Sequence, residues 1–458
     1  MIKTTTTYKR KKDNNSNVNE KSNKIPQDEP IKIKPKLYSR EYSLSKAYLD
    51  LPSTKNSVHK FIHSNRILIF TVLLLYILVD DKNHGIFKFS THMTTLADIF
   101  VNPFQLVYDV IVINLIAEMV VVNCYLFHYK KISRNTLIVL YSVIQVWLVM
   151  YTFLFVFRRR EFPIGTMLFL MMEMIITSWK THSYFMVFNY HALLKVPVTE
   201  GFQELKIKNQ SLLRYFGDYL LYMASPTLIY DQYSALRELE DQHSQTFTSR
   251  VISLLKELYV SLAIVAVLHY IHCEYIFPEL FKNQPSIWSF LKILIPAEIT
   301  FQLLYYLLYH CVFSLFADLT GFKDRLSFYD NYWEATNCKN ILQGWSKPVH
   351  SWLYRHTLVD LKDRFKLKTS VLMFFTMVFS GIFHELIVSV ITKNICVPWS
   401  TLNLVGCGIC ILLEGAFNLT NKKAYVLFIK CMLFVGHGLF YFAYYNFCFQ
   451  DYDLPLQH

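Results

Sequence analysis

The chain has 458 residues, of which 53% are hydrophobic, 16% aromatic and 17% charged, and its mean hydropathy is +0.26. A soluble globular protein of this length needs a polar surface that this composition does not supply. The composition excludes an ordinary soluble protein and indicates a membrane protein, and we expect no nucleic-acid partner despite the formal net charge of +12.

The first 60 residues are strongly basic. They hold 14 Lys or Arg against 6 Asp or Glu and lack a sustained apolar stretch. A segment of this kind cannot bury enough apolar surface to fold, so we predict a disordered, basic, cytosolic arm over residues 1–60. No cleavable signal precedes the first apolar stretch near Arg66, so we expect a transmembrane segment to direct targeting.

Residues 61–458 are predicted to form one membrane domain that is all-α and polytopic. A helix needs about 20 apolar residues to cross a bilayer, and about nine segments meet or approach that length. The first is the weakest, because only the residues between Arg66 and Asp80 are uninterrupted. The candidate spans lie at 62–79, 104–127, 135–157, 162–178, 251–277, 287–317, 370–391, 401–419 and 424–448.

The distribution of basic residues predicts the orientation of these spans. With the arm in the cytosol, nine crossings place the tail after Gln450 in the lumen and the large loops 179–250 and 318–369 in the cytosol. The basic pair at Lys130 then also faces the cytosol, as the positive-inside rule requires. The run that begins at Arg158 falls on the lumenal side, a conflict that a re-entrant or tilted helix pair would remove.

Several polar residues fall inside the predicted helices. Asn114 and Glu118 are four residues apart, so they share a helix face that should point into the bundle. Cys407 and Cys410 form a CxxC pair, but their flanks are Leu, Val and Ile, which favours helix packing over redox or metal chemistry. No metal site is expected.

His384 lies in the middle of the apolar run 370–391. An ionisable side chain at that depth is costly and usually serves a function. Ser380 lies one helical turn earlier and could hold the imidazole. A zinc-protease HExxH motif is excluded, because position 388 is Val388. Together with the polar, aromatic stretch at 328–356, which cannot span lipid, His384 indicates an enzyme whose reaction takes place inside the membrane.

Five blocks resemble segments of the membrane-bound O-acyltransferases, and within that family the sterol O-acyltransferase and diacylglycerol O-acyltransferase branch. Phe328–Glu334 is similar to the signature FYxDWWN, and Trp345–His356 to its continuation WNxPVHxWxxRH. Ser380–Leu386 is similar to the block that contains the family's catalytic His. Lys180–Tyr184 and Ser225–Tyr230 are similar to MKxHSY and APTLIY, the latter more typical of the sterol side.

This resemblance implies about nine transmembrane helices around an intramembrane catalytic tunnel. It implies that His384 is the catalytic base, with acyl-CoA as co-substrate and no further cofactor. It also implies residence in the endoplasmic reticulum membrane and a homo-oligomer, a dimer or a tetramer. Basic residues would line a cytosolic mouth for CoA, although the positive-inside rule predicts such charges without a ligand; they are Lys323, Arg325, Lys347 and Arg355. The implied substrate-binding residues are Asn331, Tyr332, Trp333, His350, Arg355 and Ser380.

The chain departs from the signature at three positions, where Asn331 replaces Asp, Tyr332 replaces Trp and Glu334 replaces the terminal Asn. In the family that Asn is thought to hold the reacting thioester or hydroxyl, which makes Glu334 a second catalytic candidate. An ionised carboxylate cannot donate a hydrogen bond to an oxyanion. Either an apolar site keeps Glu334 neutral, or Asn331 or Asn337 takes over its role, or the enzyme is slow or altered in substrate.

The function predicted from the residues and the resemblance is transfer of a fatty acyl group from acyl-CoA to the 3-hydroxyl of a sterol, giving a steryl ester. One alternative keeps this mechanism and takes diacylglycerol as acceptor. Another is a degenerate, non-catalytic lipid-binding relative, which the altered signature favours.

Overall fold

The computed structural model describes residues 57–80, 103–158, 163–194, 211–237, 247–280, 286–392 and 398–448. The chain divides into two units, residues 1–40 and 41–458, and all described residues lie in the second. The predicted arm over residues 1–60 lies outside the described residues except for 57–60. There helix α1 (Ser57–Ser64) begins, a few residues before the predicted boundary of the membrane domain.

A helix occupies each of the nine predicted spans. Within the described ranges, every regular element is helical, as the prediction of an all-α fold requires. The helices that match the nine spans are α2 (Arg66–Asp80), α4 (Pro103–His128), α5 (Arg134–Arg158), α6 (Ile164–Leu194), α9 (Phe247–Ile271), α11 (Ile287–Tyr305), α16 (Thr369–Thr392), α17 (Trp399–Phe417) and α18 (Lys423–Cys448).

Seven helical segments of the described chain are long and apolar enough to cross a membrane. Two are extended by further helical turns: α9 continues through η3 (His272–Ile276) and α10 (Phe277–Leu280), and α11 continues through η4 (Tyr306–Val312) and α12 (Phe313–Thr320). The apolar part of α2 is shorter, as its sequence predicted, and α6 is not among the seven. The chain is therefore a multi-pass membrane protein. Of its nine predicted spans, the first and the fourth are the two that are not among these seven segments.

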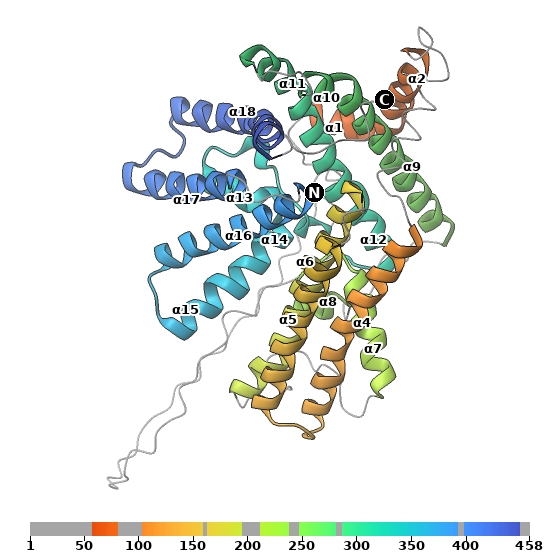
Figure 1. The fold of residues 1–458 in the computed structure, drawn as a ribbon, viewed down its shortest axis with the longest axis vertical. Coiled ribbons are helices and arrows are strands. Elements are labelled where there is room, and N and C mark those ends of the chain that lie inside the picture. Colours follow the sequence, from red (N-terminus) through yellow and green to blue (C-terminus); the bar gives the residue numbers. More distant parts are fainter. Residues whose placement is uncertain are drawn as a thin grey trace, which may run out of the picture. The chain divides into compact units, whose positions relative to one another are not determined.

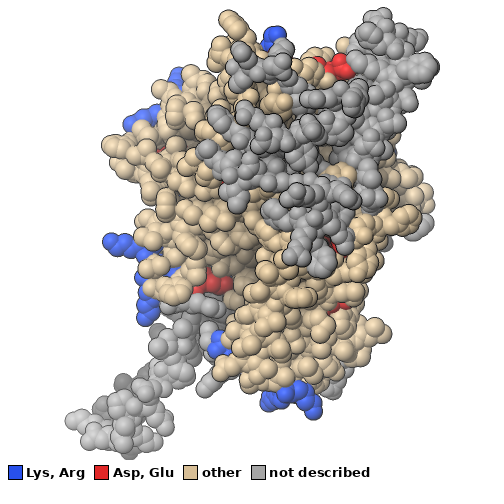
Figure 2. Space-filling view, viewed as in Figure 1, with Lys and Arg blue, Asp and Glu red and all other residues tan. Residues whose placement is uncertain are grey.

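Apolar faces that point away from the helix bundle support a membrane location. On α4 the exposed residues Phe104, Val107, Ile111, Leu115 and Met119 follow a spacing of three or four, which makes one continuous stripe. Soluble proteins rarely expose apolar surface of this extent. In Figure 2, the described Lys and Arg residues lie mainly at the margins of the face shown, and most of its described surface is neither basic nor acidic.

Helices α4, α5 and α6 pack side by side (Figure 1). Polar pairs link them inside the bundle. Tyr151 of α5 donates to Asp109 of α4 at 2.7 Å, and Asn114 of α4 donates to Glu173 of α6 at 2.9 Å. Asn114 thus points inward, as predicted. Glu173 of α6 thus has a polar partner inside the bundle.

The two large loops of the prediction contain short helices. The first holds α7 (Leu212–Ala224) and α8 (Tyr230–Arg237). The second, between α12 and α16, is almost continuous short helix, and it carries most of the predicted site residues. Its elements are η5 (Arg325–Ser327), η6 (Tyr332–Glu334), α13 (Cys338–Trp345), α14 (Lys347–Leu353), η7 (Tyr354–Val359) and α15 (Asp360–Phe365). Helix α16 packs against α17, α6, η7 and α15.

Candidate functional site

His384 lies on α16, and its imidazole is held by the helix itself. Nδ1 lies 2.8 Å from the backbone oxygen of Ser380. Because a carbonyl oxygen only accepts hydrogen bonds, Nδ1 must carry the proton, which in a neutral imidazole leaves Nε2 as an acceptor. The side chain is exposed in the protein. Ser380 therefore orients His384 as predicted, but through its carbonyl group and not its hydroxyl.

Close contact with α17 fixes the part of α16 that carries His384. A Cβ atom at Gly381 would lie 2.8 Å from the Cα of Thr401 on α17, so only glycine fits there. One turn on, Tyr444 of α18 donates to Glu385 at 3.0 Å and contacts the hydroxyl of Ser400 at 2.7 Å. The backbone around His384 is thereby held from two neighbouring helices.

The signature block at 328–334 is anchored by buried aromatic rings and backbone hydrogen bonds. The side chains of Phe328 and Tyr329 are fully buried. The amide of Asp330 donates to the backbone oxygen of Gly344 at 2.8 Å, and the amide of Lys347 donates to that of Phe328 at 3.2 Å. These bonds fold the signature block against the segment that follows it, so the two resembling blocks form one unit.

Glu334 does not have the apolar surroundings that a neutral catalytic carboxyl would need. Its side chain is exposed, and its Oε2 accepts a hydrogen bond of 2.9 Å from the amide of Asn331. Of the three alternatives for Glu334, the apolar site is the one that this exposed position does not support. Two of the three altered signature residues are joined by a hydrogen bond. Asn337 caps α13, where its Oδ1 accepts from the amide of Asn340 at 2.7 Å.

A chain of hydrogen bonds connects the signature block to α18. Tyr332 donates to Gln302 at 2.9 Å, and Gln302 donates to Glu298 at 2.8 Å. Glu298 lies 2.5 Å from Nδ1 of His437. The ring of Phe301 stacks on His437, with ring centres 3.5 Å apart. The sequence analysis did not find Gln302, whose one signal is its spacing of four from Glu298.

Lys180 joins the two early blocks. Its buried ammonium group donates to three backbone oxygens, at 3.1 Å from Tyr222, 2.7 Å from Met223 and 2.6 Å from Ser225. These carbonyls terminate α7, where a cation is favoured by the unpaired acceptors and the helix dipole. The amide of Tyr230 then donates to the hydroxyl of Ser183 at 3.1 Å. Lys180 therefore joins the two blocks by hydrogen bonds to the end of α7.

The block at 345–356 is joined to helices α6 and α8, which also carry parts of the two early blocks. The indole of Trp352 donates to the backbone oxygen of Trp179 at 2.9 Å, and the two indoles stack with centres 4.2 Å apart. Arg355 forms an ion pair with Asp231 of α8. Arg355, predicted to bind substrate, therefore connects two elements of the scaffold.

Two more of the cations expected at a CoA mouth are paired with carboxylates. Arg325 pairs with Asp318, and Lys347 lies 3.6 Å from Asp330. These pairs weaken the case that the cations of this segment receive CoA. His350 is partly buried, and burial together with the nearby charge of Lys339 lowers its pKa.

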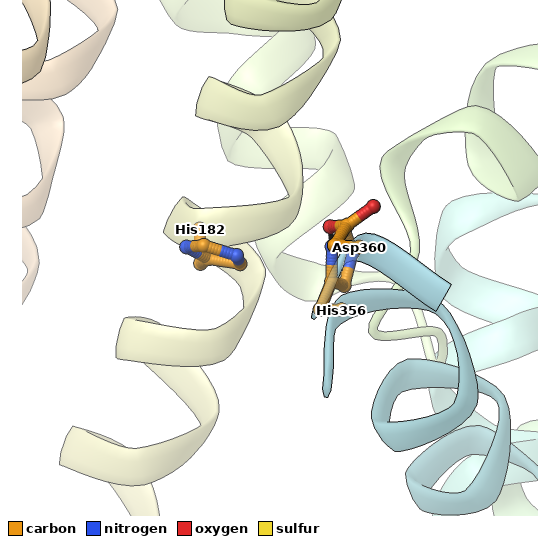
Figure 3. A group of neighbouring side chains, drawn as sticks. All are labelled: His182, His356 and Asp360. Carbon is orange, nitrogen blue, oxygen red and sulfur yellow. Dashed lines mark hydrogen bonds and ion pairs between the residues drawn. The ribbon is translucent and has the colours of Figure 1, made fainter. Parts of the chain in front are cut away.

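His182, His356 and Asp360 form a cluster that sequence reasoning did not find (Figure 3). They come from α6, η7 and α15, and each offers one donor atom within 4.8 Å of the others. The prediction of no metal site rested on short-range motifs such as HExxH. A site assembled from distant segments of the chain leaves no such motif.

The described site residues thus fall into two groups, a packed scaffold and the candidate base His384. The scaffold joins the blocks at 180–184, 225–230 and 345–356, while the signature block connects to α11 and α18. Among the described residues, no hydrogen bond or ion pair links His384 to Glu334. With Nδ1 bonded to the Ser380 carbonyl, Nε2 of a neutral His384 is an acceptor, as a general base requires.

Comparison with known proteins places these blocks in context. Over 101 residues the chain is 35% identical to a protein of Schizosaccharomyces pombe described as a probable sterol O-acyltransferase 1, covering 22% of this chain and 19% of that protein. Over 212 residues it is 25% identical to the sterol O-acyltransferase 1 of Cricetulus griseus, covering 44% and 36%. Over 183 residues it is 24% identical to the diacylglycerol O-acyltransferase 1-1 of Oryza sativa, covering 38% and 32%.

The matched segments span about a fifth to just over a third of the length of these relatives. Residues 170–397, about half of the chain, match the sequence model of the membrane-bound O-acyltransferase family. That range begins on α6, includes the scaffold and the signature block, and ends just after α16. The chain belongs to the membrane-bound O-acyltransferase family, and its family domain contains both His384 and the scaffold that surrounds α16.

Proposed function

We propose that this protein is a sterol O-acyltransferase of the endoplasmic reticulum membrane, which transfers a fatty acyl group from acyl-CoA to the 3-hydroxyl of a sterol. The observation that carries the proposal is the orientation of His384. Its Nδ1 proton is committed to the Ser380 carbonyl, so Nε2 is available as a base on a helix apolar enough to cross a bilayer.

The reaction would proceed by direct transfer between the two substrates. Nε2 of His384 accepts the proton of the sterol hydroxyl while the sterol oxygen attacks the thioester carbonyl. The bond from carbonyl carbon to sulfur breaks as the ester bond forms. The proton on the imidazole then passes to the departing thiolate, which gives free CoA and regenerates neutral His384. No cofactor is consumed, and the acceptor and product remain in the membrane.

Similarity to sterol O-acyltransferases supports a sterol as acceptor. Both Schizosaccharomyces pombe relatives carry that description, at 35% and 33% identity over about 100 residues. Diacylglycerol is the second candidate acceptor, because alignments with plant diacylglycerol O-acyltransferases are longer, up to 280 residues, at 24–26% identity. The two candidates share one mechanism and differ only in the acceptor.

A non-catalytic lipid-binding role is the third candidate, and the altered signature favours it. Glu334 replaces the family's Asn, and its carboxylate is bonded to Asn331 and exposed. Such a carboxylate cannot donate to an oxyanion. If the protein is nevertheless an enzyme, its rate would depend mainly on His384, because Glu334 would not stabilise the oxyanion.

A lipid-ester profile tests all three candidates. The full chain is expressed in cells that lack their own sterol and diacylglycerol acyltransferases, and microsomes are supplied with labelled acyl-CoA and either acceptor. We expect labelled steryl ester. Labelled triacylglycerol alone would assign diacylglycerol as the acceptor, and absence of both esters at normal protein level would favour the non-catalytic role. For the variant His384→Ala in the same assay, the matched control is His128→Ala, which alters a histidine at the end of α4, outside the family domain.

A further inference from the structure

His182, His356 and Asp360 bring together three possible metal-ligand atoms from α6, η7 and α15. The imidazoles of His182 and His356 meet edge to face, with ring centres 4.9 Å apart. Nδ1 of His356 lies 3.3 Å from Oδ2 of Asp360. In Figure 3 the ring of His182 faces the other two side chains across the gap between α6 and η7.

The cluster is enclosed. The side chain of His356 is 2% exposed and that of Asp360 is 13% exposed. Nε2 of His356 is buried, and within the described residues it has no hydrogen-bond partner. A buried imidazole nitrogen without a partner is uncommon, because losing its hydrogen bond to water carries a free-energy cost. The position therefore calls for a ligand that this nitrogen can bind.

The surroundings of His182 match those of a metal ligand. Its Nδ1 lies 2.6 Å from the hydroxyl of Tyr141 on α5, so Nε2 is the nitrogen that would bind an ion. Histidine ligands in metal sites usually engage their second nitrogen in such a bond, which fixes the ring and its tautomer. The neighbouring Arg355 forms an ion pair with Asp231.

The backbone at His356 is also unusual. His356 belongs to the π-helical turn η7, and Asp360 begins the α-helix that follows. Single π-helical turns occur frequently at functional sites, since the extra residue re-aims side chains. Here the turn places His356 and Asp360 toward the same face of α6.

We propose that His182, His356 and Asp360 bind a divalent transition-metal ion of the zinc class. Two imidazole nitrogens and one carboxylate oxygen form a donor set typical of zinc, with a fourth position left for water. Two ligand atoms of a tetrahedral zinc site lie about 3.4 Å apart, so the donors of the cluster, which lie within 4.8 Å of one another, would draw together by up to about 1.4 Å when the ion binds. The ion would fasten η7 and α15 to α6 and so stabilise the scaffold around α16.

Metal content of the full chain, purified in detergent, tests the proposal. We expect about one zinc per chain by elemental mass spectrometry, falling to background in His356→Ala and Asp360→Asn and unchanged in His128→Ala. Tyr141→Phe should keep the three ligands and weaken zinc binding by about 10–100-fold, as loss of a bond to a ligating histidine does. Elution as a single species confirms that each variant is folded.

Cobalt binding to the wild-type chain decides the question even if a variant fails to fold. Cobalt(II) in a four-coordinate site with nitrogen and oxygen ligands gives intense visible absorption bands, and we expect them to appear at one equivalent. Zinc should abolish them and raise the melting temperature, since a ligand that binds only the folded state stabilises it. Wild-type protein that contains no zinc and gives no such bands would overturn the proposal. The acyltransferase activity is measured separately and does not depend on this outcome.

Discussion

At the scale of single residues, the proposed chemistry rests on His384 and the substituted signature. His384 is oriented by a backbone carbonyl of its own helix, so its geometry depends little on distant packing. Asn331 and Glu334 satisfy each other, which suggests that the two changes act together. Each position yields a prediction that separates catalysis from structure.

His384→Ala should abolish ester formation while the protein stays folded and membrane-integrated. Removal of a general base costs about 10²–10⁴-fold in rate, and the exposed imidazole contributes little packing. The measurement is acyl transfer from labelled acyl-CoA in microsomes at equal protein level, with His437→Ala as a second histidine expected to be tolerated better. Activity of His384→Ala near the wild-type value would refute the assignment of the base.

Glu334→Asn should keep or raise the turnover, because a carboxamide can donate a hydrogen bond to the developing oxyanion whereas an ionised carboxylate cannot. Glu334→Gln should behave similarly but less well, since its amide lies one methylene further from the backbone. Initial rates at saturating acyl-CoA measure the effect. If Glu334→Asn and Asn331→Ala both leave activity unchanged, the block is structural only.

At the scale of helices, the position of His384 depends on how closely α16 approaches α17. Gly381 lies one residue after Ser380, whose carbonyl orients the imidazole. A Cβ atom added to Gly381 would lie only 2.8 Å from the Cα of Thr401, so the two backbones touch at this point. A change here should therefore act on His384 through the helix.

Gly381→Ala should destabilise the protein by about 1–3 kcal/mol, the usual cost of overpacking, and lower activity with it. The matched control is Gly406→Ala on α17, where an added Cβ meets no atom within 4 Å. That change should be neutral or slightly stabilising, by up to about 1 kcal/mol. Melting of the detergent-solubilised variants measures both effects, and equal melting temperatures would show that the contact is looser than described.

At the scale of the whole molecule, the orientation in the membrane decides where acyl-CoA enters. The basic arm and the loops at 179–250 and 318–369 are predicted to face the cytosol. The second of these loops carries the signature block and leads directly into α16. CoA is anionic and water-soluble, so the cytosolic side is where it would reach the site.

Epitope tags at the N-terminus and between α6 and α7 should be digested by protease added to sealed microsomes. A tag after His458 should be protected until detergent is added, because nine crossings leave the tail in the lumen. Digestion of the C-terminal tag without detergent would show that the number of crossings is even. This test is the most informative one for the topology for two reasons. The basic run at Arg158 falls on the predicted lumenal side, and α6 is not among the helices that are long and apolar enough to cross a membrane.

The sequence by itself determined the helices, the membrane class and the family, and it singled out His384 as the candidate base. Runs of about 20 apolar residues can satisfy their backbone hydrogen bonds in lipid only as helices, and His384 stands out because charge is costly there. Only the tertiary structure decided which side chains and backbone groups these residues contact. Asn331 donates a hydrogen bond to Glu334, and Lys180, a residue of one of the resembling blocks, donates to backbone oxygens at the end of α7. The meeting of His182 with His356 and Asp360 depends on contacts between distant segments, which no local pattern encodes.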